Sequence, residues 1–141
     1  MYEHRTQRRI EFADTDMGGI VHFSRFLVFM ETAEHQFLEA LGTSVDLVLD
    51  GKRIGWPRVA VSCSYKSPAR FGDVLRIRLR VLRKGRKSMT YAFLFTHDDG
   101  REIATGQVTS VCCELVPGRD VRAIPIPESI ASCIEEAPKE A

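Results

Sequence analysis

The sequence lacks any long hydrophobic run. Near its most regular helical pattern the longest apolar stretch is FLVFM, residues 26–30, whereas a membrane-spanning helix needs about 20 apolar residues. The N-terminus, MYEHRTQRRIEF, is basic and has no apolar core of the kind that a secretory signal requires. Neither a membrane span nor a secretory signal is indicated, so a cytoplasmic location is expected.

A strong charge of one sign is also missing. The formal net charge at pH 7 is +1, which gives the molecule no general attraction to nucleic acid or to an acidic membrane. The 44% hydrophobic and 28% charged fractions are typical of a folded globular protein. The 141 residues contain no repeat and no low-complexity linker, so we expect one domain over residues 1–141.

Cysteine is present, but not in a metal-binding arrangement. The four cysteines, Cys63, Cys112, Cys113 and Cys133, form no CxxC pair and have no histidine at zinc spacing. We therefore expect no metal and no cofactor. As neighbours on a strand, Cys112 and Cys113 should point to opposite faces, which argues against a disulfide. The expectation is four reduced, mostly buried thiols.

Hydrophobic spacing predicts one long helix. From Phe23 to Leu41, apolar residues recur at steps of three and four, while polar residues fill much of the other side. Ser24 is the predicted N-cap, and Gly42 is the predicted C-terminal stop. This helix of about five turns has a wide aromatic face, which must pack against a large, flat surface.

Alternation of apolar and polar residues predicts the strands that form this surface. The predicted strands are residues 5–13, 58–65, 74–82, 89–96 and 103–116, and residues 125–137 are a predicted short helix. Turn signals separate the last four strands, so hairpins can connect them. This order predicts an α+β fold in which the helix covers one face of an antiparallel sheet. The other face must be solvated or covered by another subunit, and apolar edge strands favour pairing across a dimer axis.

The segment DTDMGGIVHF, residues 14–23, lies just before the helix and holds the candidates for chemistry. A carboxylate here can act as a nucleophile or general base. Unpaired N–H groups at a helix N-terminus can stabilise an oxyanion. Gly18 and Gly19 allow close approach of a substrate, because no Cβ intervenes. The structural alternative is an Asx turn followed by a glycine turn, and this is the interpretation that we keep for Asp14.

This segment and the helix after it resemble hotdog-fold acyl-CoA thioesterases of the 4-hydroxybenzoyl-CoA thioesterase type. The positions in register with that family's pattern are Asp16, Gly19, Ile20, Val21, Phe26 and Glu31. The resemblance covers roughly residues 5–116. It implies a five-stranded antiparallel sheet wrapped around one long central helix. It also implies a homodimer or homotetramer with active sites between protomers.

The same resemblance assigns roles within the motif. It implies that Asp16 is the catalytic carboxylate and that a backbone N–H near Phe23 is the oxyanion donor. Gly18, Gly19 and His22 are candidates for positioning the substrate. The family's supporting histidine is expected seven residues after the aspartate, where this sequence has Phe23. The catalytic histidine role is therefore not transferred to His22.

A basic segment between residues 70 and 87 is the predicted site for coenzyme A. Strand alternation explains Arg76, Arg78 and Arg80, so the hairpin beyond them is the better candidate. The residues predicted to contact the coenzyme A phosphates are Arg83, Lys84, Arg86 and Lys87, with Ser88 beside them. A solvated strand face is the alternative. No aromatic platform accompanies these charges, which argues against nucleic-acid binding.

These features lead to one functional hypothesis with two alternatives. The hypothesis is an acyl-CoA thioesterase that converts acyl-CoA and water to a free acid and coenzyme A. The alternatives are a thioesterase acting on an acyl carrier protein and a non-catalytic acyl-ligand-binding protein. A hotdog hydratase is less favoured, because its histidine would stand five residues after the aspartate, where Val21 lies. The acyl group itself is left open.

Overall fold

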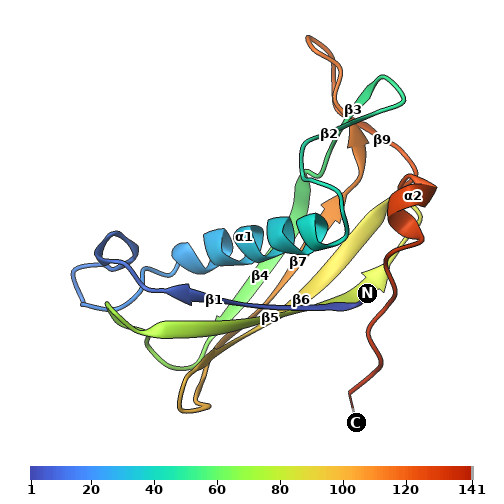
Figure 1. Cartoon of the computed structure of the whole chain (residues 1–141). Helices are drawn as coiled ribbons and strands as arrows, with labels where there is room; N and C mark the ends of the chain where they lie inside the picture. The colour runs from blue at the N-terminus through green and yellow to red at the C-terminus, as the bar shows by residue number, and fades with distance from the viewer. Residues whose placement is uncertain (141) are drawn as a thin grey trace.

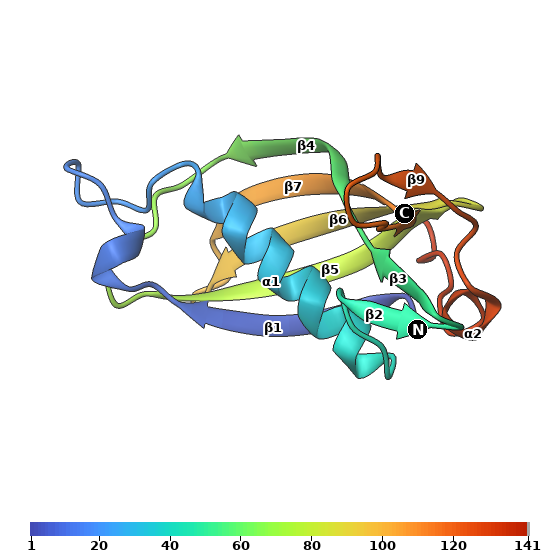
Figure 2. The same ribbon diagram turned by 90° about the horizontal axis from the view of Figure 1, so that it is seen from above.

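The computed structural model describes residues 1–140 and has a five-stranded antiparallel sheet. A long helix lies across one face of this sheet (Figures 1 and 2). The strand order is β1-β5-β6-β7-β4. The bounds are Glu3–Arg9 for β1, Arg58–Tyr65 for β4, Val74–Lys84 for β5, Ser88–His97 for β6 and Glu102–Val111 for β7. The helix, α1, spans Arg25–Ala40. The predicted α+β hotdog fold is confirmed.

The core lies between α1 and the sheet. Residues of α1 that face the sheet include Phe26, Phe29, Met30 and Phe37, none more than 3% exposed. Burying a side chain of this size contributes about 1.5–3 kcal/mol. A Cβ on Gly106 of β7 would lie 2.5 Å from the Met30 sulfur. Glycine at this position therefore lets the helix approach the sheet closely.

Several predicted boundaries are wrong. The chain leaves β1 after Arg9 and forms a 3₁₀ turn, η1, at Phe12–Asp14, so residues 5–13 are not one strand. The predicted strand 103–116 ends at Val111, and a two-residue strand, β8, follows at Cys113–Glu114. Cys112 lies between the two strands, and its side chain and that of Cys113 are both buried. The two side chains therefore do not divide between the faces of one strand.

The C-terminal helix is also shorter than predicted. Instead of residues 125–137, α2 covers only Glu128–Ala131. Its N-cap is Pro127, and Pro125 lies just before it. Proline is unfavourable in a helix interior because it has no N–H and clashes with the preceding turn. The helix therefore starts only after these prolines.

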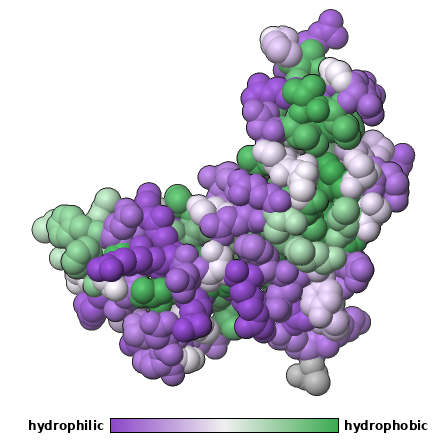
Figure 3. Space-filling view, in the orientation of Figure 1, coloured by the Kyte–Doolittle hydropathy of each residue, from purple (hydrophilic) through white to green (hydrophobic). Residues whose placement is uncertain are grey.

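A second, small sheet was not predicted. Its order is β2-β3-β8-β9, where β2 is Leu47–Leu49, β3 is Lys52–Gly55 and β9 is Arg122–Ala123. Strands of two to four residues are too short to give a visible alternation. The small sheet projects as an arm beyond the end of α1 (Figure 1). Hydrophobic surface lies over this arm (Figure 3), where Val48 and Val121 are exposed.

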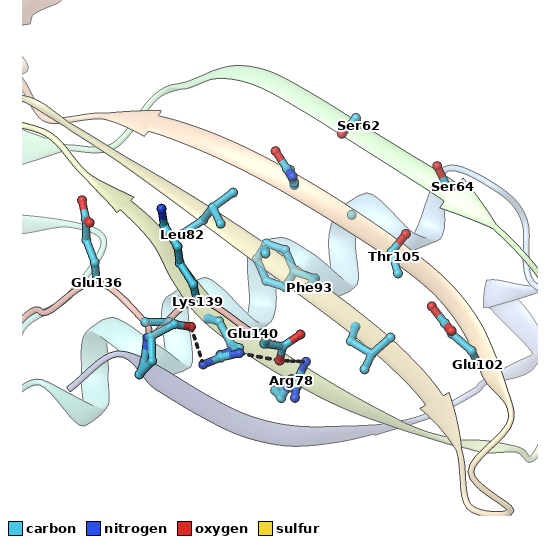
Figure 4. A pocket seen from close by; sticks show the side chains of 17 residues that line it. Ser62, Ser64, Arg78, Leu82, Phe93, Glu102, Thr105, Glu136, Lys139 and Glu140 are labelled. Atoms are coloured by element: carbon cyan, nitrogen blue, oxygen red, sulfur yellow. Dashed lines mark hydrogen bonds and ion pairs between the residues drawn. The ribbon is translucent and has the colours of Figure 1, made fainter.

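The face of the main sheet opposite α1 carries a cavity of about 740 Å³. Figure 4 shows small polar side chains such as Ser62 and Thr105 there, with Glu140 of the C-terminal segment at one side. Arg78 and Arg80 both form ion pairs with Glu140. The charges of these arginines are thus already paired within the chain, and the candidate active site lies elsewhere.

Candidate active site

The turn that carries Asp16 depends on both neighbouring glycines. Asp16 Oδ1 accepts the N–H of Gly18 at 2.8 Å, and the Asp16 carbonyl accepts the N–H of Gly19 at 3.0 Å. A Cβ on Gly18 would lie 3.1 Å from Asp16 Oδ1, and Gly19 has φ +75°. Asp16 therefore does form the Asx turn of the structural alternative. Its carboxylate is nevertheless exposed and lines a cavity.

Asp14, two residues earlier, has the opposite environment. Its side chain is 0% exposed and accepts hydrogen bonds from Arg8, Arg25 and the N–H of Glu11. Burial alone would raise the pKa of this carboxyl, but these donors outweigh burial and lower the pKa below its ordinary value. The Arg25 contact fixes the first residue of α1. Asp14 is thus a structural residue, as expected.

A cavity of about 520 Å³ opens beside the Asp16 turn. Its lining includes Asp16, Val21, Phe26, Tyr65 and Arg70. The Phe26 and Tyr65 rings meet edge to face, with centroids 5.4 Å apart. The Tyr65 hydroxyl donates to the Phe23 carbonyl at 2.8 Å, which ties the end of β4 to the start of α1. The result is an apolar, aromatic wall with a carboxylate at its edge.

The backbone N–H of Phe23 is available at this cavity. The N–H of His22 donates to the Asp14 carbonyl at 2.8 Å, and that of Ser24 donates to His22 Nδ1 at 3.2 Å. Within residues 1–140, the N–H of Phe23 between them donates to no acceptor. It stands just before α1, where the helix dipole adds positive potential. It can therefore donate to a substrate oxygen.

His22 is occupied by a local structural role. Its Nδ1 lies 2.7 Å from the Ser24 hydroxyl, and its ring stacks on Phe23 with centroids 4.7 Å apart. It does not line the Asp16 cavity. Ser24 is the N-cap by position, but its side chain makes no capping hydrogen bond to the helix. Ser24 is thus confirmed as the N-cap residue, although its hydroxyl is bonded to His22 and not to a backbone N–H of the helix.

The predicted coenzyme A hairpin lies at the other end of the sheet from Asp16 (Figures 1 and 2). The 11 residues of β5 span roughly 35 Å at about 3.3 Å each. Arg83, Arg86 and Lys87 are exposed. Lys84 differs, because its ammonium donates to the carbonyls of Ala131 and Ile134 at 2.6 and 2.9 Å. Within one chain, the hairpin and Asp16 do not meet.

A buried polar cluster under α1 was missed from the sequence. Glu34 is 0% exposed; it accepts from Arg58 at 3.1 Å and from Ser110 at 2.8 Å. Burial raises the pKa of the Glu34 carboxyl despite these two donors. The signal was present in the sequence: Glu34 stands four residues from both Met30 and Leu38, on the inward face of the helix.

The remaining predictions concern metals, thiols and membranes. Within residues 1–140, no three His, Cys, Asp or Glu side chains come together as metal ligands would. The four cysteines are free thiols, and burial raises the pKa of Cys112 to about 11. In this part of the chain, no helix has the length and hydrophobicity to cross a bilayer.

Residues 10–134 match the family described as the Thioesterase-like superfamily, and the chain belongs to this family. It is 27% identical over 135 residues to the 1,4-dihydroxy-2-naphthoyl-CoA hydrolase of Thermosynechococcus vestitus, covering 96% of this chain and 90% of that one. It is 32% identical to a solved gentisyl-coenzyme A thioesterase, with a TM-score of 0.79 and coverage of 90% and 98%.

A further solved structure shares the fold at lower identity. The 1,4-dihydroxy-2-naphthoyl-CoA thioesterase Slr0204 from Synechocystis has a TM-score of 0.82 at 23% identity, covering 93% of this chain and 94% of that one. The resemblance to hotdog acyl-CoA thioesterases, drawn from residues 5–116, is thereby confirmed. The chain is a thioester hydrolase of the family that acts on coenzyme A thioesters.

Proposed function

We propose that this protein hydrolyses an aromatic acyl-CoA, with Asp16 as nucleophile or general base and the Phe23 N–H as oxyanion donor. The observation that carries the proposal is that an exposed carboxylate and an N–H with no acceptor among residues 1–140 border the same aromatic-walled cavity. A thioester needs both groups, one to attack or deprotonate water and one to hold the developing negative charge. An oxyanion donor contributes about 2.7–4 kcal/mol to such a reaction.

Two routes use the same residues. In the first, an Asp16 oxygen attacks the thioester carbonyl, the C–S bond breaks and coenzyme A leaves as a thiolate. Water then opens the resulting anhydride and regenerates the carboxylate. In the second, Asp16 takes a proton from water as the water attacks the carbonyl; the C–S bond of the resulting intermediate then breaks, and the proton held by Asp16 passes to the departing coenzyme A thiolate. We favour the first, because the Gly18 N–H holds Oδ1 and leaves the other oxygen free to attack.

The aromatic preference rests on the cavity wall and on the relatives. Phe23, Phe26 and Tyr65 offer ring faces and edges to a planar acyl group. By their names, two relatives act on 1,4-dihydroxy-2-naphthoyl-CoA and gentisyl-CoA. The first name places a hydroxyl on the carbon next to the acyl-bearing carbon, and a gentisyl group has one in the same place. We therefore take a 2-hydroxyaroyl-CoA as the substrate class.

A homodimer would complete the site. β4 is an edge strand of the main sheet, and its Val59, Val61 and Tyr65 are 62%, 50% and 48% exposed. Tyr65 lies at the Asp16 end of β4, whereas Arg58 pairs with Ser110 near the basic hairpin. Antiparallel pairing of β4 with its copy would therefore bring the hairpin of one protomer to the Asp16 end of the other.

Thiol release from a panel of acyl-CoA substrates tests the function. We expect kcat/KM to be highest for 2-hydroxyaroyl-CoA and at least tenfold lower for aliphatic acyl-CoA. A preference for acyl carrier protein substrates, or binding without thiol release, would reject the proposal. Sedimentation at micromolar concentration tests the dimer. A well-folded, active monomer near 15.9 kDa would contradict it.

A further inference from the structure

Two cations line the Asp16 cavity, and they differ in their partners. Lys66 forms an ion pair with Glu102 at 2.9 Å. Arg70 lines the same cavity, but its guanidinium forms no ion pair or hydrogen bond within residues 1–140. Its hydrogen bonds are those of the backbone with Asp73: the Arg70 N–H donates to the Asp73 carboxylate at 2.8 Å, and the Arg70 carbonyl accepts the N–H of Asp73 at 3.0 Å. Arg70 therefore brings an uncommitted positive charge and five N–H donors to the edge of an apolar cavity.

The loop that carries Arg70 is held firmly against the loop that carries Asp16. The Ala69 carbonyl accepts the N–H of Val21 at 2.8 Å. On the other side, Ile10 donates to the Asp73 carbonyl at 2.8 Å and accepts from Gly72 at 3.0 Å. These bonds tie residues 69–73 to both ends of the segment that contains Asp16. The position of Arg70 relative to Asp16 is thus set by the backbone.

The side chain of Arg70 reaches the catalytic turn itself. Its Nη1 lies 4.0 Å from the point that a Cβ on Gly19 would occupy. Gly19 donates its N–H to the Asp16 carbonyl, so the guanidinium stands beside the backbone of the turn that presents the Asp16 carboxylate. Arg70 and Asp16 therefore line one cavity, in which both can contact the same acyl group.

We propose that Arg70 is the specificity residue that binds the hydroxyl oxygen next to the acyl carbon of a 2-hydroxyaroyl-CoA. The inference rests on the function proposed above. A hydroxyl in that position lies beside the thioester carbonyl, where Arg70 stands. The planar guanidinium donates well to phenol or phenolate oxygen. A site built to bond a substrate hydroxyl strongly rejects the analogue that lacks it, because its polar groups are then left unpaired.

The competing role for Arg70 is binding a coenzyme A phosphate. The pantetheine arm separates the phosphates from the thioester, whereas Arg70 lies at the turn that presents Asp16. Geometry therefore favours contact with the acyl group. The two roles give different results with a truncated substrate, the acyl thioester of N-acetylcysteamine, which keeps the acyl group and lacks every phosphate.

The test compares kcat/KM for 2-hydroxybenzoyl-CoA and benzoyl-CoA in the full-length protein. We expect wild type to prefer the 2-hydroxy substrate, and Arg70→Ala to reduce that ratio roughly tenfold or more while benzoyl-CoA turnover changes little. Arg70→Lys should restore part of the ratio. The control is Arg76→Ala, which removes an exposed, ion-paired arginine of β5 and should leave the ratio unchanged. Thermal melting checks that each variant is folded.

Each outcome decides the assignment. The same loss of ratio with N-acetylcysteamine thioesters supports contact with the acyl group. An equal loss for both acyl groups, confined to the coenzyme A substrates, would show that Arg70 binds phosphate and overturn the inference alone. An unchanged ratio in Arg70→Ala and Arg70→Lys would also overturn it. A wild-type protein inactive on every aroyl-CoA would instead remove the proposed function and this inference together.

Discussion

Asp14 and Asp16 stand two residues apart on one loop, and the structure gives their side chains opposite environments. The Asp14 side chain is buried and bonded to two arginines and a backbone N–H. The Asp16 side chain is exposed, and within residues 1–140 it is bonded only to the N–H of Gly18. A carboxylate that holds a loop in place needs several fixed donors. A carboxylate that reacts needs a free oxygen and room for a substrate.

The buried carboxylate of Asp14 also helps to position a group that is proposed to act together with Asp16. Asp14 binds Arg25, the first residue of α1, through its carboxylate, while its carbonyl accepts the N–H of His22. These contacts fix the chain on both sides of Phe23. The N–H that we assign to the oxyanion therefore owes its position to Asp14. The contrast between support and reaction can be tested by changing each residue separately.

The largest effect on stability is expected at Asp14. Asp14→Asn removes the charge that partners Arg8 and Arg25, so two guanidinium groups lose their anion. Breaking a buried pair costs about 3–5 kcal/mol. Because both arginines are about one-third exposed, we expect the lower end, about 3 kcal/mol. Urea unfolding should show a lower midpoint with an unchanged slope, and kcat per folded molecule should fall much less than in Asp16→Asn.

Acid titration sharpens the same comparison. The folded pKa of Asp14 lies below its ordinary value of 3.8. Its contribution to stability is therefore complete above that value and is lost as the pH falls through the lower, folded pKa. Wild type should lose stability in this window, and Asp14→Asn should lose less. Equal acid sensitivity in the two proteins would assign the effect to other carboxylates.

The largest effect on activity is expected at Asp16. Asn keeps the side-chain oxygen that accepts the Gly18 N–H, so Asp16→Asn should preserve the turn, the fold and the oligomeric state. The reactive anion is lost, and kcat should fall by at least about 10². Near-wild-type turnover by the purified variant would return Asp16 to a purely structural role.

A single turnover in ¹⁸O-water, with enzyme in excess, separates the two routes through Asp16. Attack by the carboxylate, followed by water opening the anhydride at the Asp16 carbon, places the label in Asp16 and leaves the first acid released unlabelled. Attack by activated water labels the product acid at once. Mass spectrometry of the peptide that contains residue 16 reads the difference.

Changes in the basic hairpin are expected to have a smaller effect on activity. In the structure, Lys84 has a different environment from the other basic residues of this hairpin. Reversing the charge at the exposed Arg83, Arg86 and Lys87 should raise KM about tenfold, the loss of one charge-assisted contact, with little change in kcat. The increase should shrink at high salt, since screening acts over about 8 Å at physiological ionic strength. Lys84→Glu should instead lower stability, because the Lys84 ammonium binds two carbonyls near α2.

A truncated acyl-pantetheine substrate is the control for this experiment. It lacks the phosphates that the hairpin is proposed to contact, so the charge-reversal variant should process it as wild type does. An equal loss with the truncated substrate would mean that these side chains do not bind the phosphates.

Much of this arrangement could be predicted from the sequence, because strands and helices follow from the regular spacing of hydrophobic residues. The alternation of β5 predicted that Leu75, Ile77 and Leu79 are buried, and they are at most 3% exposed. The spacing of α1 and the stop at Gly42, with φ +83°, were equally clear. Local patterns carry no information about which distant segments meet. The sequence therefore left Arg70 in a basic run, whereas the fold places it beside Asp16.

The short strands and the partner of the Ser24 hydroxyl were missed for a different reason. β8 and β9 contain two residues each and form only because neighbouring segments are already in place. Ser24 is the N-cap residue, as predicted, but its hydroxyl is bonded to His22 at 2.7 Å and not to the helix. Such choices between nearby partners depend on geometry of about an ångström, which residue order does not encode.

The smallest effect in this set is expected at His22, on the same loop as Asp14 and Asp16. Its Nδ1 is engaged with Ser24, and its ring lies outside the Asp16 cavity. His22→Ala should therefore lower kcat by no more than about tenfold, equivalent to roughly 1.4 kcal/mol, through a looser start of α1. Asp16→Asn measured in parallel sets the scale. A loss as large as that of Asp16→Asn would mean that His22 takes part in the chemistry, and the loop would then hold two reactive side chains rather than one.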